Sequence, residues 1–553
     1  MSTSQKPMIR SAIGKLNTGE FITLRSTVPR CLLLLLTICP VVEAGLTIYP
    51  TPPNAQISSS FSLTIDGKRV PVIKYMDYHY AHFAFSQTVH LTVDVSQRVD
   101  SQTIRPASLG IDAQASEKKL TFSMTQAPDT DSTPRYLVVQ INDLEKLVIL
   151  GDPLEAGVPS PSGKGVFNVV NDYGADPTGA TYTQPAIQNA IDAASAFGTP
   201  STPGIVYVPP GVFKVRAALR LKENVDLYLS PGSALKADDN VSNYPIRGSG
   251  TIDPVLMIGN ANNVTIRGRG EIDASGVALM NLLSQPPPVF LTQSKTHPRR
   301  RVIQSDDQGT SRNISISGVI IKDATGWTVD LVKMKGVMVQ NVKVLNHKNI
   351  NWKIQNDGIN ATSSSDVLVN QCFVMTIDDA MCSKARYKSI VSMDNVVFSN
   401  NVLWTWAAGV KAGMQNDHPM NGVVFRNIDI VHCRRAIAVD TKTSQDNDET
   451  IPIENVEFRN VRVDQIEGHW KASNHDAVDF LLEDAPVHNI SISSLTLPKK
   501  RPIRCGPTYS ASGVTFHQFI MDGELITDIS QVRLEGKQPV ENLTFAIEAR
   551  ESD

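Results

Sequence analysis

The sequence is poor in the features that mark several protein classes. Its 52 Lys and Arg residues against 55 Asp and Glu residues leave a net charge of −3, without the basic excess typical of a nucleic-acid-binding protein. Six cysteines in 553 residues are too few for a disulfide framework, and no pair has zinc-finger spacing. With 41% hydrophobic and 19% charged residues, the composition is that of a globular protein long enough for two domains.

Long apolar runs are also scarce, because the segment 31–42 alone is strongly apolar, and it is too short to span a bilayer. Arg25 and Arg30 precede it, and a Val-x-Ala sequence ends at Ala44, which is typical of a secretory signal. We therefore expect a signal peptide over 1–44 and a secreted protein with no membrane contact after cleavage. A buried strand is the alternative interpretation.

The cysteines and the glycosylation sequences depend on that secretion. Cys372 and Cys382 can pair in an oxidising compartment, although small buried hydrophobes are the interpretation that we favour. The other cysteines expected in the mature chain are Cys433 and Cys505. In a secreted eukaryotic chain, some of the Asn-x-Ser/Thr sequences predict a glycoprotein. They begin at Asn240, Asn263, Asn313, Asn360, Asn489 and Asn542.

The chain divides into two kinds of strand pattern. Residues 45–156 contain short alternating strands such as "FSLTIDG" and "HLTVDVS", which predict an antiparallel β-sandwich. Residues 157–165 are rich in Gly, Pro and Ser and predict a linker. Residues 166–553 then hold a short amphipathic helix, with Thr183 as a plausible N-cap and Pro185 in its first turn, followed by a long series of strands.

From residue 262 onward one pattern recurs, an Asn or Asp followed by alternating β-branched residues. Examples are "NNVTIRG", "SDVLVNQCFVM", "NGVVFRNIDIV" and "HNISISSLTL", mostly spaced by twenty to thirty residues or so. Strand repeats at this period without helices between them predict a parallel β-helix, in which inward Val, Ile and Phe form one continuous core. Stacked propeller blades are the alternative, but the turns lack a Trp-Asp signature. Residues 285–312 break the rhythm and are expected to loop out, with Arg299, Arg300 and Arg301 in solvent or on a substrate.

Three carboxylates stand out on this predicted solenoid. Asp357 lies in an Asn-Asp-Gly turn, and Asp378 and Asp379 follow an apolar run. Because 21 residues is close to one coil, we expect Asp357 and Asp378 on adjacent coils. Neighbours in a regular strand point to opposite faces, so Asp379 joins them only if the chain bends there. Crowded carboxylates differ in pKa and can supply both an acid and a base for glycoside hydrolysis. Acidic surface turns are the alternative.

Several quoted stretches resemble known families. "FNVVNDYGADPTGATYTQPAIQNAIDAA" and "GIVYVPPGVFKV" resemble the entry segment of pectate-lyase-type right-handed β-helices. "NDGIN" followed by "IDDAMCSK" resembles the acidic motifs of the polygalacturonases of glycoside hydrolase family 28. The dextranase and isopullulanase family, family 49, is similar and also carries an N-terminal sandwich. The resemblance covers roughly residues 165–490.

The resemblance implies a mechanism residue by residue. Asp378 would be the general acid, and Asp357 and Asp379 would hold and activate water, with inversion of configuration. Asn356, before the first acid, and Lys384, after the pair, would contact substrate. No metal and no organic cofactor is implied.

The sequence also departs from the polygalacturonase pattern. Ala408, in "WAAGVKAG", stands where those enzymes carry the histidine of Gly-His-Gly. Ala438 and Asp440 stand where they carry the Arg-x-Lys that grips the substrate carboxylate. An acid at Asp440 would repel galacturonate, so we expect a substrate other than plain galacturonan. Lys411, Arg434 and Arg435 either form a different anion site or are solvated bases. Trp352, Trp404 and Trp406 either stack on sugar rings or pack internally.

Together these features predict a secreted, monomeric, inverting glycoside hydrolase acting on a polysaccharide, either a modified pectic glycan or a neutral one such as an α-glucan. The expected substrate contacts are Asn356, Lys384, Lys411, Trp406 and Asp440. A polysaccharide lyase using the acids as calcium ligands is one alternative. A binding or structural β-helix without catalysis is another.

Overall fold

The computed structural model describes residues 45–126, 133–247, 250–280, 299–305, 309–346, 354–386, 393–443, 451–467 and 475–546. The predicted signal peptide and Trp352 lie outside these ranges. In the described ranges, no helix combines the length and the apolar character that a membrane crossing requires.

The N-terminal part is a β-sandwich of two sheets. Its outer sheet follows the order β3-β2-β6-β9-β8 and alternates buried and exposed residues, as expected for strands with one face in a core. The other sheet follows the order β1-β5-β11-β10-β7, with β4 beside β5, and β5 and β11 pair in parallel within this otherwise antiparallel sheet. The strands are β1 (Leu46–Ile48), β2 (Phe61–Ile65), β3 (Lys68–Val70), β4 (Ile73–Tyr75), β5 (Tyr78–Phe85), β6 (Thr88–Val95), β7 (Gln102–Arg105), β8 (Ala113–Ser116), β9 (Lys119–Thr125), β10 (Arg135–Ile141) and β11 (Lys146–Asp152).

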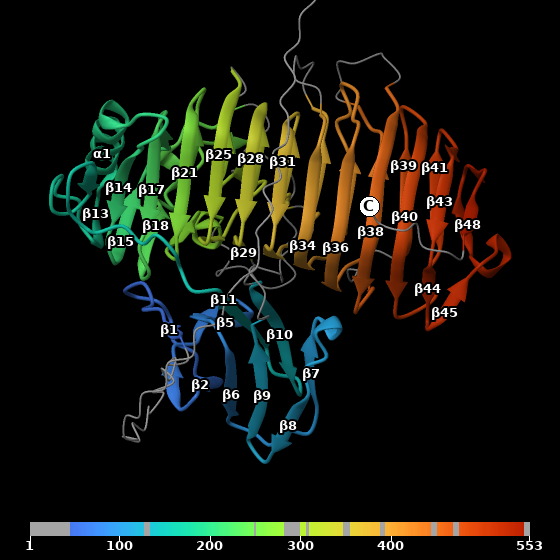
Figure 1. The fold of residues 1–553 in the computed structure, drawn as a ribbon, viewed down its shortest axis with the longest axis horizontal. Helices are drawn as coiled ribbons and strands as arrows, with labels where there is room; N and C mark the ends of the chain where they lie inside the picture. Colours follow the sequence, from blue (N-terminus) through green and yellow to red (C-terminus); the bar gives the residue numbers. More distant parts are fainter. Residues whose placement is uncertain are drawn as a thin grey trace, which may run out of the picture. The chain divides into compact units, whose positions relative to one another are not determined.

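The rest of the described chain winds into a parallel β-helix with three walls, seen in Figure 1 as rows of parallel arrows. The first wall contains β12 (Val166–Asn168), β14 (Gly204–Val208), β17 (Val225–Leu229), β21 (Asn262–Gly268), β25 (Ser311–Ser317), β28 (Met334–Gln340), β31 (Ser365–Asn370), β34 (Val396–Trp404), β36 (Val423–His432), β38 (Ile453–Val463), β40 (Val487–Leu497) and β43 (Val514–His517). The second wall contains β13 (Thr178–Tyr182), β15 (Gly211–Val215), β18 (Ser233–Ala237), β22 (Glu271–Asp273), β26 (Ile320–Lys322), β29 (Lys343–Leu345), β32 (Phe373–Met375) and the last residues of β34 and β36.

The third wall positions the acidic residues. It contains β16 (Leu219–Leu221), β20 (Leu256–Ile258), β24 (Ile303–Ser305), β27 (Val329–Val332), β30 (Ile359–Thr362), β33 (Met381–Lys384), β35 (Ala408–Gly413), β37 (Arg435–Asp440), β39 (Asp476–Leu482), β41 (Ile503–Pro507) and β46 (Leu534–Gly536). Helix α1 (Gln184–Phe197) packs Ile187, Ala190, Ile191 and Ala194 against the first coils. The prediction of an all-β chain with a sandwich before a parallel β-helix is confirmed.

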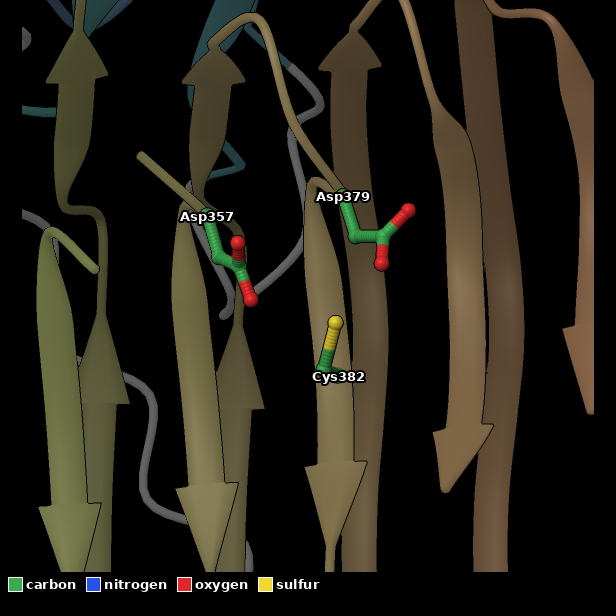
Figure 2. Close-up of side chains that lie close together, drawn as sticks. All are labelled: Asp357, Asp379 and Cys382. Atoms are coloured by element: carbon green, nitrogen blue, oxygen red, sulfur yellow. The ribbon is translucent and has the colours of Figure 1, made fainter. Parts of the chain in front are cut away.

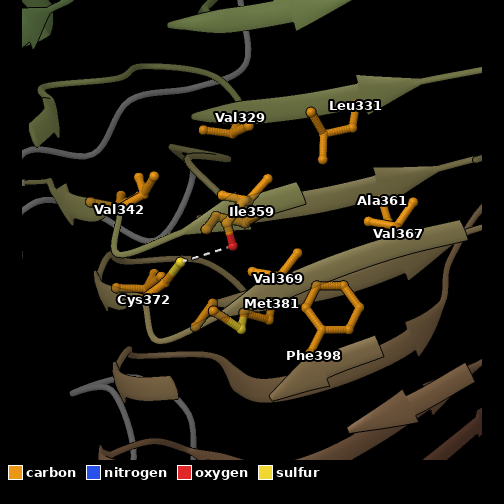
Figure 3. Packing of buried hydrophobic residues seen from close by; sticks show 14 of the residues in the cluster. Val329, Leu331, Val342, Ile359, Ala361, Val367, Val369, Cys372, Met381 and Phe398 are labelled. Carbon is orange, nitrogen blue, oxygen red and sulfur yellow. Dashed lines mark hydrogen bonds between the residues drawn. The ribbon is translucent and has the colours of Figure 1, made fainter. Parts of the chain in front are cut away.

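Stacked apolar side chains explain why the repeats form one core. Val329, Ile359 and Met381 follow one another on adjacent coils of the third wall, as Figure 3 shows. In the first wall, the Phe398 and Phe425 rings stack with centroids 4.7 Å apart and planes 6° from parallel. Each coil therefore buries its apolar face only because the next coil covers it.

The repeated asparagines have a separate cause. Asn400, Asn427 and Asn460 all have positive φ values, between 54° and 58°, which asparagine tolerates better than most residues. The Asn400 side-chain amide donates to Asn370 at 2.8 Å, and that of Asn460 donates to Asn427 at 3.2 Å. The second Asn of the sequence repeat is thus a ladder residue at a tight turn.

Two expectations need correction. Residues 299–305 do not loop out, because they form β23 (Arg299–Arg300) and β24. Arg300 is 1% exposed and donates to two backbone oxygens, so it is a structural residue rather than a substrate contact.

Asn360 is fully buried on β30, which excludes a glycan at that position. The four described cysteines are free and buried.

The sandwich packs on the second wall through an apolar cluster and a buried charge cluster. Tyr78 and Tyr136 of the sandwich donate to the backbone oxygens of Asn346 and Gln371 at 3.0 and 3.2 Å. Asp152, at the end of β11, accepts from Lys343 at 2.7 Å, and it also pairs with Arg269 and His82 at 3.1 and 2.8 Å. The domain boundaries at residues 156 and 165 stay predictions.

Candidate active site

The acids lie where the chain enters the third wall. Ile359 of β30 pairs with Met381 of β33, which places Asp357 beside Asp379 on adjacent coils (Figure 2). The Gly358 amide donates to the Asp379 backbone oxygen at 3.0 Å. A Cβ on Gly358 would lie 2.4 Å from the Ala380 oxygen, so this close approach requires the glycine. The expected proximity of Asp357 to the acidic pair is thus present, and Asp379 is its partner in register.

A turn brings Asp378 and Asp379 into the same region. Residues 376–380 connect β32 to β33 outside regular strand geometry, so the alternation of strand faces does not apply to them. The Asn356 side-chain oxygen accepts from the Ile377 and Asp378 amides at 3.2 and 3.3 Å, and its side chain is fully buried. Asn356 therefore supports the turn that carries Asp378, whereas the sequence suggested a sugar contact.

Three cations neutralise part of this acidic cluster. Lys384 Nζ lies 2.8 Å from Asp357 Oδ2, and Lys411 Nζ lies 3.2 Å from Asp379 Oδ2. Arg435 lies 3.4 Å from Asp379. All three come from third-wall strands that follow the acids, so successive coils supply the charges.

These contacts give the three acids different protonation behaviour. Burial, together with the charges of Asp357 and Asp379, raises the pKa of Asp378 well above its usual range. Burial also raises the pKa of Asp357, against the opposing charge of Lys384. For Asp379, burial opposes ionisation, but Lys411 and Arg435 hold its pKa below the usual range. Asp379 is thus a stable carboxylate, and Asp378 is the acid that retains its proton to the highest pH.

The cluster does not fit a divalent cation. Oxygens of Asp357 and Asp379 and the sulfur of Cys382 lie within 4.8 Å of one another (Figure 2). However, burial raises the pKa of Cys382 well above its usual range, which disfavours the thiolate that binds metals. Lys384 and Lys411 already form ion pairs with the carboxylate oxygens of Asp357 and Asp379 that a metal ion would need.

The remaining expected contacts are more enclosed than the sequence suggested. Lys411 is 3% exposed and bridges Asp379 to Asp440, whose oxygen lies 2.9 Å away. Trp404 is buried and Trp406 is half-buried, with their ring centroids 5.2 Å apart. Trp406 also meets His432 edge-on at 4.4 Å. The aromatic residues after the acids thus form a packed cluster, whose half-buried member is Trp406.

Sequence reasoning missed a residue one coil before Asp357. Because Val329 pairs with Ile359, Trp327 occupies the position of Asp357 on the preceding coil. Lys384 Nζ lies 4.2 Å from the Trp327 ring centroid, and the Arg301 guanidinium lies 5.0 Å from it. The signal was available, since Trp327 precedes its strand by the same two residues as Asp357 and Asp379.

Replacing Lys384 by Gln is expected to move the acid limb of the pH–activity profile to higher pH. Lys384 favours the ionised form of Asp357, so its loss raises the pKa of Asp357, and this carboxyl group is then protonated at a higher pH. The measurement is kcat/KM against pH, with Lys335→Gln, an exposed lysine of the first wall, as the control. An unchanged acid limb would show that Asp357 is not the titrating base.

Comparison with known proteins adds a family match. The family model described as "Rhamnogalacturonase A/epimerase, pectate lyase-like" matches residues 166–463, more than half of the chain. An exo-poly-alpha-D-galacturonosidase of Dickeya chrysanthemi is 33% identical over 122 residues, which cover 19% of each chain. Plasmin and fibronectin-binding protein A of Streptococcus pneumoniae is 30% identical over 182 residues, 32% of this chain and 24% of the relative. The chain thus spans about a fifth to a quarter of the length of these curated relatives.

The described fold also matches a solved enzyme structure. Endo-xylogalacturonan hydrolase from Aspergillus tubingensis superimposes with a TM-score of 0.51. The match covers 70% of this chain and all of the enzyme, at 17% identity. At that identity the likeness concerns the fold alone.

Proposed function

Because the chain belongs to the rhamnogalacturonase A/epimerase, pectate lyase-like family, we propose that it is a glycoside hydrolase that cleaves a polysaccharide by single displacement with inversion. One observation carries the proposal. Three aspartates meet on adjacent coils, and their surroundings push the pKa values of Asp378 and Asp379 in opposite directions. An acid and a base of this kind, side by side, are what glycoside hydrolysis requires.

In this proposal Asp378 protonates the leaving glycosidic oxygen. Its raised pKa keeps the carboxyl protonated, and its half-buried position leaves part of it open to substrate. The Asn356 side chain and Thr405 both bind the Asp378 backbone. The Thr405 hydroxyl donates to the Asp378 backbone oxygen at 2.5 Å, and the Asn356 side-chain oxygen accepts from the Asp378 amide. The Asp378 Oδ1 also accepts from the Asp379 amide at 3.0 Å, so backbone and carboxyl contacts together hold the proton donor in place.

Asp357 and Asp379 would hold the attacking water. Their oxygens lie within 4.8 Å of each other, so one water molecule can donate to both at ordinary hydrogen-bond lengths of about 2.8 Å. Lys411 and Arg435 keep Asp379 ionised, and Asp357 can then accept the proton that the water loses. Direct attack by water, with no covalent intermediate, is what inverts the anomeric centre.

The substrate would be a polysaccharide other than plain galacturonan. Asp440 is an acid at the place where the polygalacturonase pattern has a lysine that binds the substrate carboxylate, and the nearby Lys411 is already paired with it at 2.9 Å. A modified pectic glycan and a neutral α-glucan both remain candidates on this reasoning. Secretion and a monomeric state stay part of the proposal.

A binding function without catalysis is the second candidate. It is favoured by the 30% identity to plasmin and fibronectin-binding protein A, a match that covers a quarter of that protein. The two proposals differ in turnover, which a binding protein lacks.

The test is the release of reducing ends from a panel of pectins, dextran, pullulan, arabinans and galactans, with and without a chelator. We expect release from at least one glycan, at an unchanged rate in the chelator, because lysine and arginine side chains occupy the carboxylates. A rate that collapses in the chelator and returns with calcium would favour a lyase. Tight glycan binding without any release would favour the binding function.

A further inference from the structure

The column of residues that carries the acids becomes basic on later coils. Asn356 and Asp357 precede β30, and Asp378 and Asp379 precede β33. The pairing of Arg435 with Asp476 places Arg434 beside His475 on the next coil. The pairing of Val478 with Ile503 then places Arg501 level with Asp476, one residue past the line of Arg434 and His475, on the following coil. Arg434 and His475 thus continue the line of Asp378 on two successive later coils, and Arg501 lies one residue beside that line on the next.

The three residues differ from the cations that touch the acids. Lys411 and Arg435 are each shared between two aspartates, so their charges are already balanced. The Nε of Arg434 is buried and has no hydrogen-bond partner among the described residues. Arg501 donates through Nη2 to the Ile466 oxygen at 2.8 Å, and its Nε is buried without a partner among the same residues.

The charges of this group repel one another. Burial and the neighbouring Arg435 lower the pKa of Arg434. Burial, Arg501 and Arg434 lower the pKa of His475, against the opposing charge of the exposed Glu467. An arginine whose buried Nε has no partner is costly, and an anion that accepted its hydrogen bonds would remove that cost.

We propose that Arg434, His475 and Arg501 form an anion subsite that binds a carboxylate or sulfate group of the substrate. Arg434 lies two coils beyond Asp378, about 10 Å along the wall at the usual strand spacing. Arginine binds such groups through two parallel hydrogen bonds, and a histidine N–H adds a third donor. This inference rests on the proposed function and narrows its substrate to a glycan that carries negative charge on the β37-to-β41 side of the cleaved bond.

The subsite would take over a role that Asp440 and Ala438 do not fill. Both lie further along β37, where Asp440 pairs with Lys411 and Ala438 has no polar side chain. Arg434 directly precedes that strand, at its opposite end. The substrate charge would therefore be bound nearer the catalytic turn than the polygalacturonase pattern places it.

The test measures binding apart from turnover. Affinities of oligomeric polygalacturonate, its carboxyl-reduced product and a sulfated galactan are measured by calorimetry on the Asp378→Asn protein, with and without Arg434→Gln. We expect at least one anionic glycan to bind, and Arg434→Gln to weaken it about tenfold to a hundredfold more than it weakens the reduced product. Arg434→Lys should recover part of the loss, and Arg312→Gln, an exposed arginine of β25, is the matched control.

The outcomes identify the ligand and separate the anion subsite from the proposed hydrolase activity. Preference for polygalacturonate identifies a carboxylate ligand, and preference for the sulfated galactan identifies a sulfate ligand. Binding that depends on Arg434 in a protein that releases no reducing ends would sustain the subsite and reject the hydrolase. Turnover of a charged glycan with an unchanged KM in Arg434→Gln would reject the subsite and sustain the hydrolase. Absence of binding to every anionic probe would also overturn the subsite.

Discussion

Asp378→Asn is expected to lower kcat on the cleaved glycan by about 100- to 10,000-fold, while the protein remains folded. The amide cannot donate the proton that the leaving oxygen needs. The hydrogen bond from Thr405 and that to Asn356 use the backbone of residue 378, so the substitution leaves them in place. The measurement is reducing-end release at saturating substrate for the variant and the wild type.

The matched control for this experiment is Asp366→Asn, an aspartate on β31 of the first wall whose side chain is 43% exposed. It should retain wild-type turnover. Near-normal release in Asp378→Asn would mean that another group is the acid. Glycans with good leaving groups provide a further check, because they need less protonation and should recover part of the lost rate.

Asp152→Asn is expected to destabilise the protein by about 3–5 kcal/mol. Asp152 is fully buried and pairs with Lys343 and Arg269 of the β-helix, so the amide leaves two buried cations without a countercharge. The measurement is the midpoint of denaturant unfolding, followed with probes in both the sandwich and the β-helix.

Asp94→Asn provides the comparison for that experiment. Asp94 pairs with Lys119 at 2.9 Å on the exposed face of the sandwich, where such a pair contributes about 1 kcal/mol or less. Equal shifts in the two variants would contradict the view that the buried charges join the sandwich to the β-helix. A loss confined to the sandwich probe would show that the two parts unfold separately.

Much of the β-helix was predictable, because its repeats obey simple rules. In "NGVVFRNIDIV" the Gly after the first Asn and the second Asn have positive φ and mark turns, and the alternating Val, Ile and Phe mark the inward face. The position of Asp357 relative to the acidic pair followed from the coil length, and the structure places the two sets on adjacent coils. Which residue of the pair lies directly beside Asp357 was less predictable, because a shift of one residue in the turn would place Asp378 there instead of Asp379.

Other features depend on contacts that the sequence does not encode locally. Asp152 and Lys343 are 191 residues apart, and neither lies in a motif. Arg300 was expected in an irregular loop, but its segment pairs with β19 (Thr251–Ile252) across a long gap in the chain. Asn356 was assigned to substrate by its place next to Asp357, whereas its buried oxygen binds the turn of the following coil. Such roles depend on which residues of successive coils lie beside one another. Coil lengths vary too much for the sequence alone to predict that register.

A single displacement inverts the anomeric centre, so the configuration of the first product tests the roles of the three aspartates. Proton NMR during the earliest turnover of a cleaved glycan distinguishes the anomer released by the enzyme before it equilibrates. We expect the new reducing end to have the opposite configuration to the bond that was cleaved. Retained configuration would require a covalent intermediate, and an unsaturated product would show a lyase, so either result would contradict the roles given to Asp357, Asp378 and Asp379.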